Sequence, residues 1–356
     1  MAERLIIIGG VAAGMSAAAK ARRTNPDLEI VVYEKSGYVS YGACGFPYFI
    51  KGDVPRMEAL IARTPAQMAA QGVTACVHHE VVDIDPAQRT VRVRNHANGT
   101  EFTDHWDKLI ITTGASVNRP PIPGVHLPGV FTLRTVEDAL AIRRWLVQEK
   151  PKHGVIVGAS YIGLEMAEAL HAHGVAVTIV EMADQVMPTM DADMAALILP
   201  ELQAHGVQVC LRQPVKSFVG PTLVREVVRE VAAKVQGEER EENGRLRIRE
   251  VLTQGSILAA DVVIFGAGGR PNVALAQAAG IALGQTGAIA VDAQQRTNVP
   301  GIWAAGATAE SHHLVLGQPA YWPLAAPANK QGRVAGTNAA GGLATFGGVV
   351  GTAVAK

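Results

Sequence analysis

The chain has 356 residues, enough for two or three domains. Hydrophobic residues make up 48% and charged residues 18%, a composition that supports a large core and argues against disorder. The 32 basic and 32 acidic residues cancel, so charge gives no reason to expect binding to nucleic acid or to an anionic membrane. No apolar run approaches the roughly 18 residues of a membrane span, and the apolar run at residues 5–8 is too short for a signal peptide. We therefore expect a soluble, cytoplasmic protein.

The chain opens with a predicted strand–helix–strand unit. A strand at residues 5–8 leads through Gly9 and Gly14 into an alanine-rich helix, and a second strand at residues 30–33 ends on Glu34. The first glycine permits a tight turn, and the helix N-terminus offers N–H groups to a pyrophosphate. The acidic residue lies about 20 residues beyond the last glycine, the position that receives ribose hydroxyls in dinucleotide sites.

Cys44 follows this unit closely and has Gly42 and Gly45 beside it. A helix beginning near Gly45 would stabilise its thiolate. No second cysteine lies near in the sequence, so the thiol would cycle through a mixed disulfide with a substrate or through sulfenic acid. Cys76 and Cys210 stand in apolar segments typical of strands, where a thiol is expected to pack as a small hydrophobic group. Without a CxxC pair we expect no disulfide framework and no metal site.

A second copy of the unit follows a predicted strand at residues 108–113 and a proline-rich linker at residues 119–123. Its two strands are expected at residues 155–157 and 177–180. The candidate site residues follow the first strand and the second strand in turn: Gly158, Ser160, Tyr161, Ile162 and Gly163, and then Glu181. One glycine motif is weak evidence, but two copies with strand, helix and acid in register are strong evidence. Both copies lack the middle glycine of the fingerprint, which is replaced by Val11 and by Ser160.

The order of the segments predicts an α/β fold with two Rossmann-like dinucleotide-binding domains, the second inserted into the first. A returning strand at residues 261–266 ends the insertion, and a charged segment at residues 236–249 is expected to be an exposed loop. The predicted domains are 1–118 with 272–330, the inserted 119–271, and a tail at 331–356.

Five motifs together resemble those of a known family: residues 9–14, 40–48, 161–165, 297–306 and 323–330. The chain is similar to FAD-dependent pyridine nucleotide–disulfide oxidoreductases of the single-cysteine branch, and most like coenzyme A disulfide reductases. The resemblance covers nearly all 356 residues.

This resemblance implies two cofactors, FAD and NADH, with NADPH as a possible substitute. The residues implied for FAD are Gly9, Gly10, Ala12, Ala13, Gly14, Glu34, Lys35, Val82, Thr113, Gly114, Gly306, Ala307, Leu324 and Ala325. The nicotinamide nucleotide would bind the residues of the second copy together with Gly268. The carboxylate of Glu181 disfavours a 2′-phosphate and so favours NADH.

The resemblance also implies a substrate, a small-molecule disulfide such as coenzyme A disulfide or a related persulfide or polysulfide. Cys44 would be its catalytic residue, and the implied substrate contacts are Ser16, Lys20, Arg23, Ser40, Ala43 and His312. Lys20 and Arg23 share one helix face and could meet coenzyme A phosphates, or they could form an ordinary solvated face. His312 could equally be a surface or packing histidine.

The chain departs from the family at two places. Ala307 occupies the position of an aspartate that hydrogen-bonds the flavin ribityl chain, so weaker flavin binding is expected. The sequence stops at Lys356, where the dimerisation domain of these homodimeric proteins would begin. Two alternatives therefore stay open. One is an NADH oxidase or peroxidase that cycles Cys44 through sulfenic acid, although that branch carries a histidine in the first glycine loop. The other is an inactive nucleotide-binding fragment.

Overall fold

The computed structural model describes residues 2–220 and 247–353, which form two compact units. Unit 1 contains Met1–Cys44, Glu58–Ser116 and Arg270–Val354, and unit 2 contains Gly45–Met57 and Val117–Gly269. Most of the charged segment 236–249 lies outside the described residues, so its expected loop is not tested there.

Unit 1 is built on a parallel five-stranded sheet of order β18-β7-β1-β2-β3. The strands are β1 (Arg4–Ile8), β2 (Glu29–Tyr33), β3 (Val73–Cys76), β7 (Lys108–Ile111) and β18 (Ile302–Ala304). After Arg4, strand β1 is apolar because it is covered on both faces, as is usual for parallel sheets. Its residues Leu5, Ile6 and Ile7 are fully buried.

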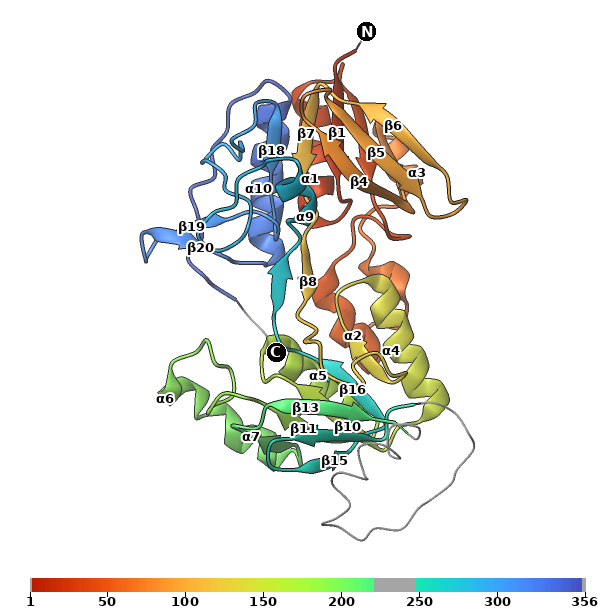
Figure 1. Cartoon of the computed structure of the whole chain (residues 1–356), viewed down its shortest axis with the longest axis vertical. Helices are drawn as coiled ribbons and strands as arrows, with labels where there is room; N and C mark the ends of the chain where they lie inside the picture. Colours follow the sequence, from red (N-terminus) through yellow and green to blue (C-terminus); the bar gives the residue numbers. More distant parts are fainter. Residues whose placement is uncertain (1, 221–246, 354–356) are drawn as a thin grey trace. The chain divides into compact units, whose positions relative to one another are not determined.

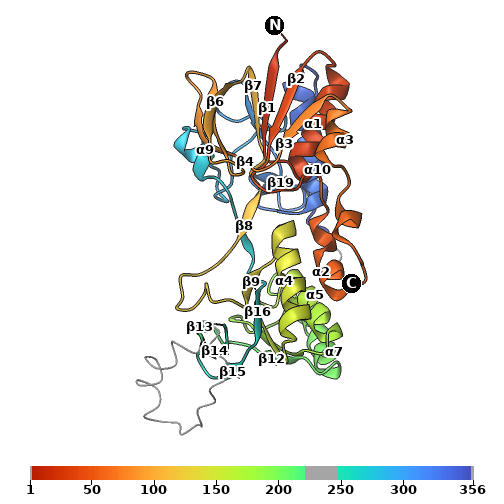
Figure 2. The ribbon, with the colours of Figure 1, turned by 90° about the vertical axis from the view of Figure 1, so that its right-hand side faces the viewer.

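Helices cover one face of this sheet and an antiparallel sheet covers the other (Figure 2). The helices are α1 (Ala12–Thr24), α3 (Pro65–Ala69) and α10 (Ala325–Ala339), and the antiparallel strands are β4 (His79–Asp85), β5 (Thr90–Asn95) and β6 (Glu101–His105). Along β1, Leu5 and Ile7 pack toward the helices, whereas Ile6 and Ile8 pack toward β4 and β5. This alternation is the side-chain period of a strand.

The smaller elements of unit 1 lie in its second half and around Cys44. They are α9 (Ala274–Ala278), the hairpin β19 (Ser311–His313) with β20 (Gln318–Ala320), and the 3₁₀ turns η1 (Ala43–Gly45) and η2 (Met57–Leu60). Helices α1 and α10 lie side by side (Figure 1). Gly332 and Gly336 of α10 permit this close approach, because a Cβ at either would collide with the backbone of Ala13 or Ala17.

Unit 2 repeats this plan. Its parallel sheet has the order β12-β11-β10-β16-β9 and consists of β9 (Val130–Thr132), β10 (His153–Val157), β11 (Ala176–Val180), β12 (Gln208–Cys210) and β16 (Val262–Phe265). An antiparallel sheet is formed by β13 (Val215–Val219), β14 (Glu250–Thr253) and β15 (Ile257–Ala259). The helices are α2 (Phe46–Lys51), α4 (Val136–Glu149), α5 (Tyr161–Ala172), α6 (Ala192–Ala195) and α7 (Ile198–Ala204).

The chain passes between the units through two short strands that pair, β8 (Ala115–Val117) and β17 (Gly269–Pro271). These crossings fall close to the linkers predicted from the sequence. The packing also groups residues 45–57 with unit 2, a segment that the sequence analysis placed in the flavin-binding domain. The functional boundaries of the domains stay predictions.

Candidate active site

The first glycine turn connects β1 to α1 in a conformation that only glycine adopts readily. Gly9 has φ +98°, and a Cβ there would collide with the carbonyl oxygen of Thr112. A Cβ on Gly14 would collide with the carbonyl oxygen of Gly9. The turn therefore stacks tightly on the end of the sheet, and α1 begins at Ala12 with its N-terminus at the carboxyl edge of β1.

Glu34 follows the end of β2 and binds the backbone of this turn through its side chain. Its side chain is buried at 7% exposure, and its two oxygens accept hydrogen bonds from the Gly10 N–H at 2.7 Å and the Ser36 N–H at 2.8 Å. A carboxylate has about four acceptor positions, so about two are left for ribose hydroxyls. The buried carboxylate fits the adenosine ribose of a dinucleotide.

Val11 is the N-cap residue of α1, and its side chain makes no capping hydrogen bond. The first N–H groups of a helix have no partner within the helix and attract anions. A valine at this position leaves that role to a ligand, whereas a serine would satisfy one of the N–H groups itself.

The remaining candidates for FAD lie on neighbouring segments of unit 1. Gly306, with φ +80°, contacts the start of α1, since a Cβ there would lie 2.8 Å from the Cβ of Ala13. Leu324 is the N-cap residue of α10, and Ala325 is its first residue. Ala307 is partly exposed, and its carbonyl accepts a hydrogen bond from the Tyr321 hydroxyl at 3.1 Å. Val82 is half-buried on β4, and Lys35 is exposed after β2.

Thr113 and Gly114 follow β7 and are held by a residue that the sequence analysis missed. The Asn272 side chain donates to the Thr113 carbonyl at 2.8 Å, and its backbone carbonyl accepts from the hydroxyls of Thr113 at 2.7 Å and Thr308 at 3.0 Å. Gln331 was missed too, although its buried amide accepts from the Gly306 N–H at 2.9 Å. Gln331 stands between Lys330 and Arg333 in a polar stretch of α10, so no local sequence signal marks its side chain as buried.

Cys44 lies at the centre of η1, is exposed, and precedes α2, which begins at Phe46. The segment before it is fastened to the first glycine turn, because the Ser40 N–H donates to the Gly10 carbonyl at 2.8 Å. Ser40 has φ +53°, a left-handed conformation that costs energy for a residue other than glycine. The other side is held by the bond from Gly42 N–H to the Leu60 carbonyl, 2.9 Å. Thus the structure brings Ser40 together with the glycine turn, and Ala43 follows three residues later as the first residue of η1.

The other predicted substrate contacts are distributed over α1 and the β19–β20 hairpin. Ser16 donates to the side chain of Asn329 at 2.8 Å, while Lys20 and Arg23 lie farther along α1, with Arg23 exposed. His312 is exposed on β19, whereas the adjacent His313 is buried and lies edge-on to Trp322 at 5.9 Å between ring centroids. Packing therefore accounts for His313 and leaves His312 available to a ligand.

Unit 2 carries the second glycine turn. Gly158 has φ +101°, and a Cβ on Gly163 would collide with the Gly158 carbonyl oxygen. Ser160 is the N-cap residue of α5, and its hydroxyl donates to the Gly266 carbonyl at 2.5 Å. Tyr161 and Ile162 begin the helix, with Tyr161 exposed, and Gly268 has φ +72° after β16.

Glu181 repeats the arrangement of Glu34 closely. It is 7% exposed and accepts from the Ala159 N–H at 2.7 Å and the Ala183 N–H at 2.9 Å. Beyond it, the Met187 N–H donates to the Ala159 carbonyl with Met187 at φ +47°, as Ser40 does with Gly10 in unit 1. Two turns with the same backbone bonding and the same buried acid fit two dinucleotides.

Cys76 and Cys210 end the equivalent strands β3 and β12. Their backbone carbonyls accept the N–H groups of Glu34 and Glu181, both at 2.9 Å. Their thiols pack against the cores of the two units, and burial raises the pKa of each thiol. Within residues 2–220 and 247–353, no group of three or more His, Cys, Asp or Glu side chains is placed to hold a metal ion. Over the same residues no helix is long and apolar enough to cross a membrane.

The fold is α/β, with two glycine turns of the kind that bind dinucleotides and an exposed cysteine four residues after Ser40, which bonds to the first turn. The family model for pyridine nucleotide-disulphide oxidoreductases matches residues 3–332, and the chain belongs to that family. The predicted fold class, the family resemblance, and the class of FAD-dependent, NAD(P)H-linked oxidoreductase are thereby confirmed.

Several known relatives have sulfur compounds in their names, and one, from Methanocaldococcus jannaschii, is named an NADH oxidase and is 34% identical over 355 residues, covering 99% of this chain and 73% of the relative. The chain is 36% identical over 357 residues to an NAD(P)H coenzyme A polysulfide/persulfide reductase of Pyrococcus horikoshii, covering 100% of this chain and 74% of the relative. It is 30% identical over 324 residues to a coenzyme A disulfide reductase of Staphylococcus epidermidis, covering 91% and 67%. It superposes on the structure of an NAD-dependent persulfide reductase from A. fulgidus with a TM-score of 0.89 at 36% identity, covering 99% of this chain but only 62% of that one.

Proposed function

We propose that the chain passes electrons from NADH through FAD to a small-molecule disulfide by way of Cys44. The observation that carries this proposal is the hydrogen bond from Ser40 to Gly10, which fastens the segment of an exposed cysteine to the first dinucleotide turn. Coenzyme A disulfide, or a related persulfide or polysulfide, is the proposed substrate. The names of the relatives support this class of substrate.

Each group of residues has a distinct task. The turn at Gly9–Gly14 and the carboxylate of Glu34 would hold FAD, which when bound accepts a hydride from the reduced nicotinamide and supplies two electrons to sulfur. The turn at Gly158–Gly163 and Glu181 would hold the nicotinamide nucleotide. The buried carboxylate of Glu181 repels a 2′-phosphate, which favours NADH over NADPH.

Cys44 performs the sulfur chemistry. Its thiolate attacks one sulfur of the substrate disulfide; a bond forms between Cys44 and that sulfur, the substrate S–S bond breaks, and the first thiol leaves with a proton. Two electrons then cleave the mixed disulfide, which regenerates the Cys44 thiolate and releases the second thiol. The sum is one NADH, one proton and one disulfide converted to NAD⁺ and two thiols. Lys20 and Arg23 are proposed to bind the phosphates of coenzyme A, with Ser16 and His312 as further contacts.

An anaerobic assay tests the proposal. Purified protein supplied with FAD, NADH and coenzyme A disulfide should release thiol, and Cys44→Ser should abolish the release. Cys76→Ser serves as the matched control, because that thiol is partly buried at a strand end, and it should retain activity. Thiol release that survives in Cys44→Ser would overturn the mechanism.

A second candidate function uses the same exposed, solitary thiol. Hydrogen peroxide would oxidise the Cys44 thiolate to sulfenic acid with release of hydroxide, and two electrons from NADH with a proton would restore the thiolate as the sulfur-bound oxygen leaves as water. In that case NADH consumption follows oxygen or peroxide and requires no disulfide. A visible spectrum before and after addition of NADH separates both enzymes from an inactive fragment, which would show no flavin reduction.

A further inference from the structure

The helix that follows Cys44 is short and needs partners for its last carbonyl groups. Helix α2 has six residues, and the final carbonyls of any helix lack N–H donors within the helix. The Tyr48 carbonyl accepts from the N–H groups of Gly52 at 3.0 Å and Val54 at 3.1 Å, with Gly52 in the left-handed conformation at φ +109°. The next two carbonyls, of Phe49 and Ile50, are bound by side chains from distant parts of the sequence.

Arg143 on α4 binds the first of these carbonyls. Its Nη1 donates to the Phe49 carbonyl at 2.9 Å and lies 3.3 Å from the carbonyls of both Val54 and Pro55. The guanidinium carbon also lies 4.4 Å from the centre of the Phe49 ring. One cation therefore holds the end of α2 through charge-assisted hydrogen bonds and a cation–π contact.

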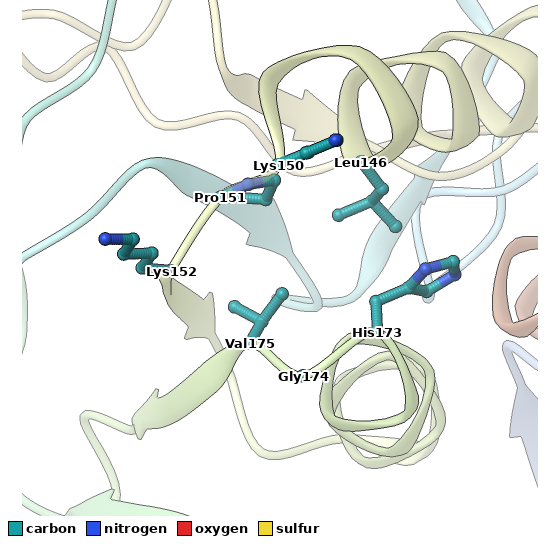
Figure 3. Close-up of a pocket in the computed structure, with 7 residues that line it drawn as sticks. All are labelled: Leu146, Lys150, Pro151, Lys152, His173, Gly174 and Val175. Carbon is teal, nitrogen blue, oxygen red and sulfur yellow. The ribbon is translucent and has the colours of Figure 1, made fainter.

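His173, directly after α5, binds the second carbonyl. Its Nε2 lies 2.7 Å from the Ile50 carbonyl, and because a carbonyl only accepts, this nitrogen carries the hydrogen. The ring lies at one side of a surface cavity of about 300 Å³ lined by Leu146, Lys150, Pro151, Lys152, Gly174 and Val175 (Figure 3). Lys150 and Lys152 extend in opposite directions there, so their charges do not converge on one point. The wall of this cavity thus contains the histidine that binds α2.

Lys51 adds an exposed ion-pair cluster with Glu168 of α5 at 2.9 Å and with Asp53 at 3.1 Å. Exposed pairs of this kind contribute little because water screens them. Arg143 and His173 are therefore the main polar attachments of α2 to α4 and α5, beside the burial of Phe46, Phe49 and Ile50.

We propose that Arg143 and His173 are positioning residues for Cys44. The turn η1 continues directly into α2, so Cys44 lies two residues before a helix whose end these side chains fix. Helix α5 has the glycine turn of the second dinucleotide site at its start and His173 just beyond its end. The same helix thus carries both the proposed NADH contacts and an anchor of the cysteine segment. This inference rests on the proposed function, in which Cys44 is the reacting thiol.

The test separates the two half-reactions in the flavin-loaded protein. In Arg143→Ala we expect the rate of flavin reduction by NADH to stay within about twofold of the wild type, while disulfide reduction slows by about ten- to a hundredfold, the range for a displaced reacting group. Arg143→Lys keeps the positive charge but loses the planar guanidinium group with its several donors. Its rate of disulfide reduction should therefore lie between those of Arg143→Ala and the wild type. His173→Gln retains a side-chain donor and should be milder than His173→Ala. Arg144→Ala, the exposed neighbour on α4, is the matched control and should behave as wild type.

A second readout does not depend on turnover. Amide hydrogen exchange of residues 46–55 should become faster in Arg143→Ala and in His173→Ala but not in Arg144→Ala. Unchanged exchange in that segment, or an equal slowing of both half-reactions, would overturn the inference. Failure of the proposed function has a different signature: Cys44→Ser would still release thiol, while the exchange measurement would continue to report the anchoring of α2.

Discussion

The three cysteines differ in exposure, and this difference predicts their order of reaction. Cys44 is exposed, whereas Cys76 and Cys210 are partly buried and burial raises the pKa of both. A raised pKa means that less of each thiol is deprotonated at neutral pH, and only the thiolate reacts with alkylating agents.

At about pH 7 we therefore expect iodoacetamide to label Cys44 first, with Cys76 and Cys210 following only as the pH rises toward their higher pKa values. Peptide mass spectrometry of samples quenched at increasing times measures this order. Labelling of Cys76 at the same rate as Cys44 would contradict the packing of β3 against the core.

Ala307 offers a second prediction for a single residue. It follows Gly306 at a partly exposed position, so an aspartate can be introduced without displacing core side chains. If the position faces the flavin ribityl chain, Ala307→Asp should strengthen FAD binding by about 1.5–3 kcal/mol, or roughly 10- to 150-fold. Titration of the apoprotein with FAD, followed by flavin fluorescence, measures the change.

Ala307→Asn is the control for this substitution, because it has similar shape but no charge, and it should give a smaller gain. Equal or weaker FAD binding in Ala307→Asp would place residue 307 away from the flavin.

At the scale of elements, the contact between α1 and α10 links the glycine turn to the rest of unit 1. Gly332 lies directly against the backbone of Ala13, the second residue of α1. Gly332→Ala should therefore separate the helices and lower the free energy of unfolding by about 1–3 kcal/mol, as overpacking generally does. It should also weaken FAD binding, since α1 starts at the flavin turn.

Thermal unfolding of the apoprotein together with an FAD titration checks both effects. Arg333→Ala, an exposed neighbour on α10, provides the comparison and should leave stability nearly unchanged. If Gly332→Ala unfolds at the wild-type temperature, the close contact between the helices does not contribute to stability.

Much of the element order could be predicted because it depends on local patterns. The apolar runs at residues 5–8 and 155–157, the glycine turns and the acids at their ends each need only a short window of sequence, and the structure has β1 and β10 at those positions. The packing of α2 in unit 2 could not be predicted in this way. The polar contacts of this helix come from Arg143 and His173, which are 94 and 123 residues from their partners in the sequence.

The site residues likewise divide into those marked by a local sequence pattern and those whose partners are distant in the sequence. Glu34 and Glu181 could be found because their spacing from the glycines is fixed by one strand–helix–strand unit. Asn272 could not, because its role is to bond Thr113, 159 residues earlier, across the return of the chain into unit 1. No local pattern distinguishes such an asparagine from one in an ordinary loop.

For the whole molecule, the internal repeat gives a matched pair of substitutions with different expected outcomes. Glu34 and Glu181 have equal exposure, and each accepts from two backbone N–H groups at equivalent positions, so Glu34→Gln and Glu181→Gln remove the same charge from the same kind of surroundings. Each should cost about 1.5–3 kcal/mol of nucleotide binding, because a charge-assisted bond becomes a neutral one.

The repeat nevertheless serves two cofactors, so the loss should appear in different measurements. Glu34→Gln should lower the FAD content of the purified protein, with excess FAD restoring activity, and leave the KM for NADH nearly unchanged. Glu181→Gln should keep the flavin and raise the KM for NADH by roughly 10- to 150-fold. It should also reduce the preference for NADH over NADPH, because the 2′-phosphate of NADPH no longer meets a negative charge. The double variant should show the sum of the two effects, since each carboxylate accepts hydrogen bonds from its own unit and the two share no partner. Loss of flavin from Glu181→Gln would reverse the assignment of the two turns, and a loss of both nucleotides from either variant would mean that the acids support the fold rather than the ligands.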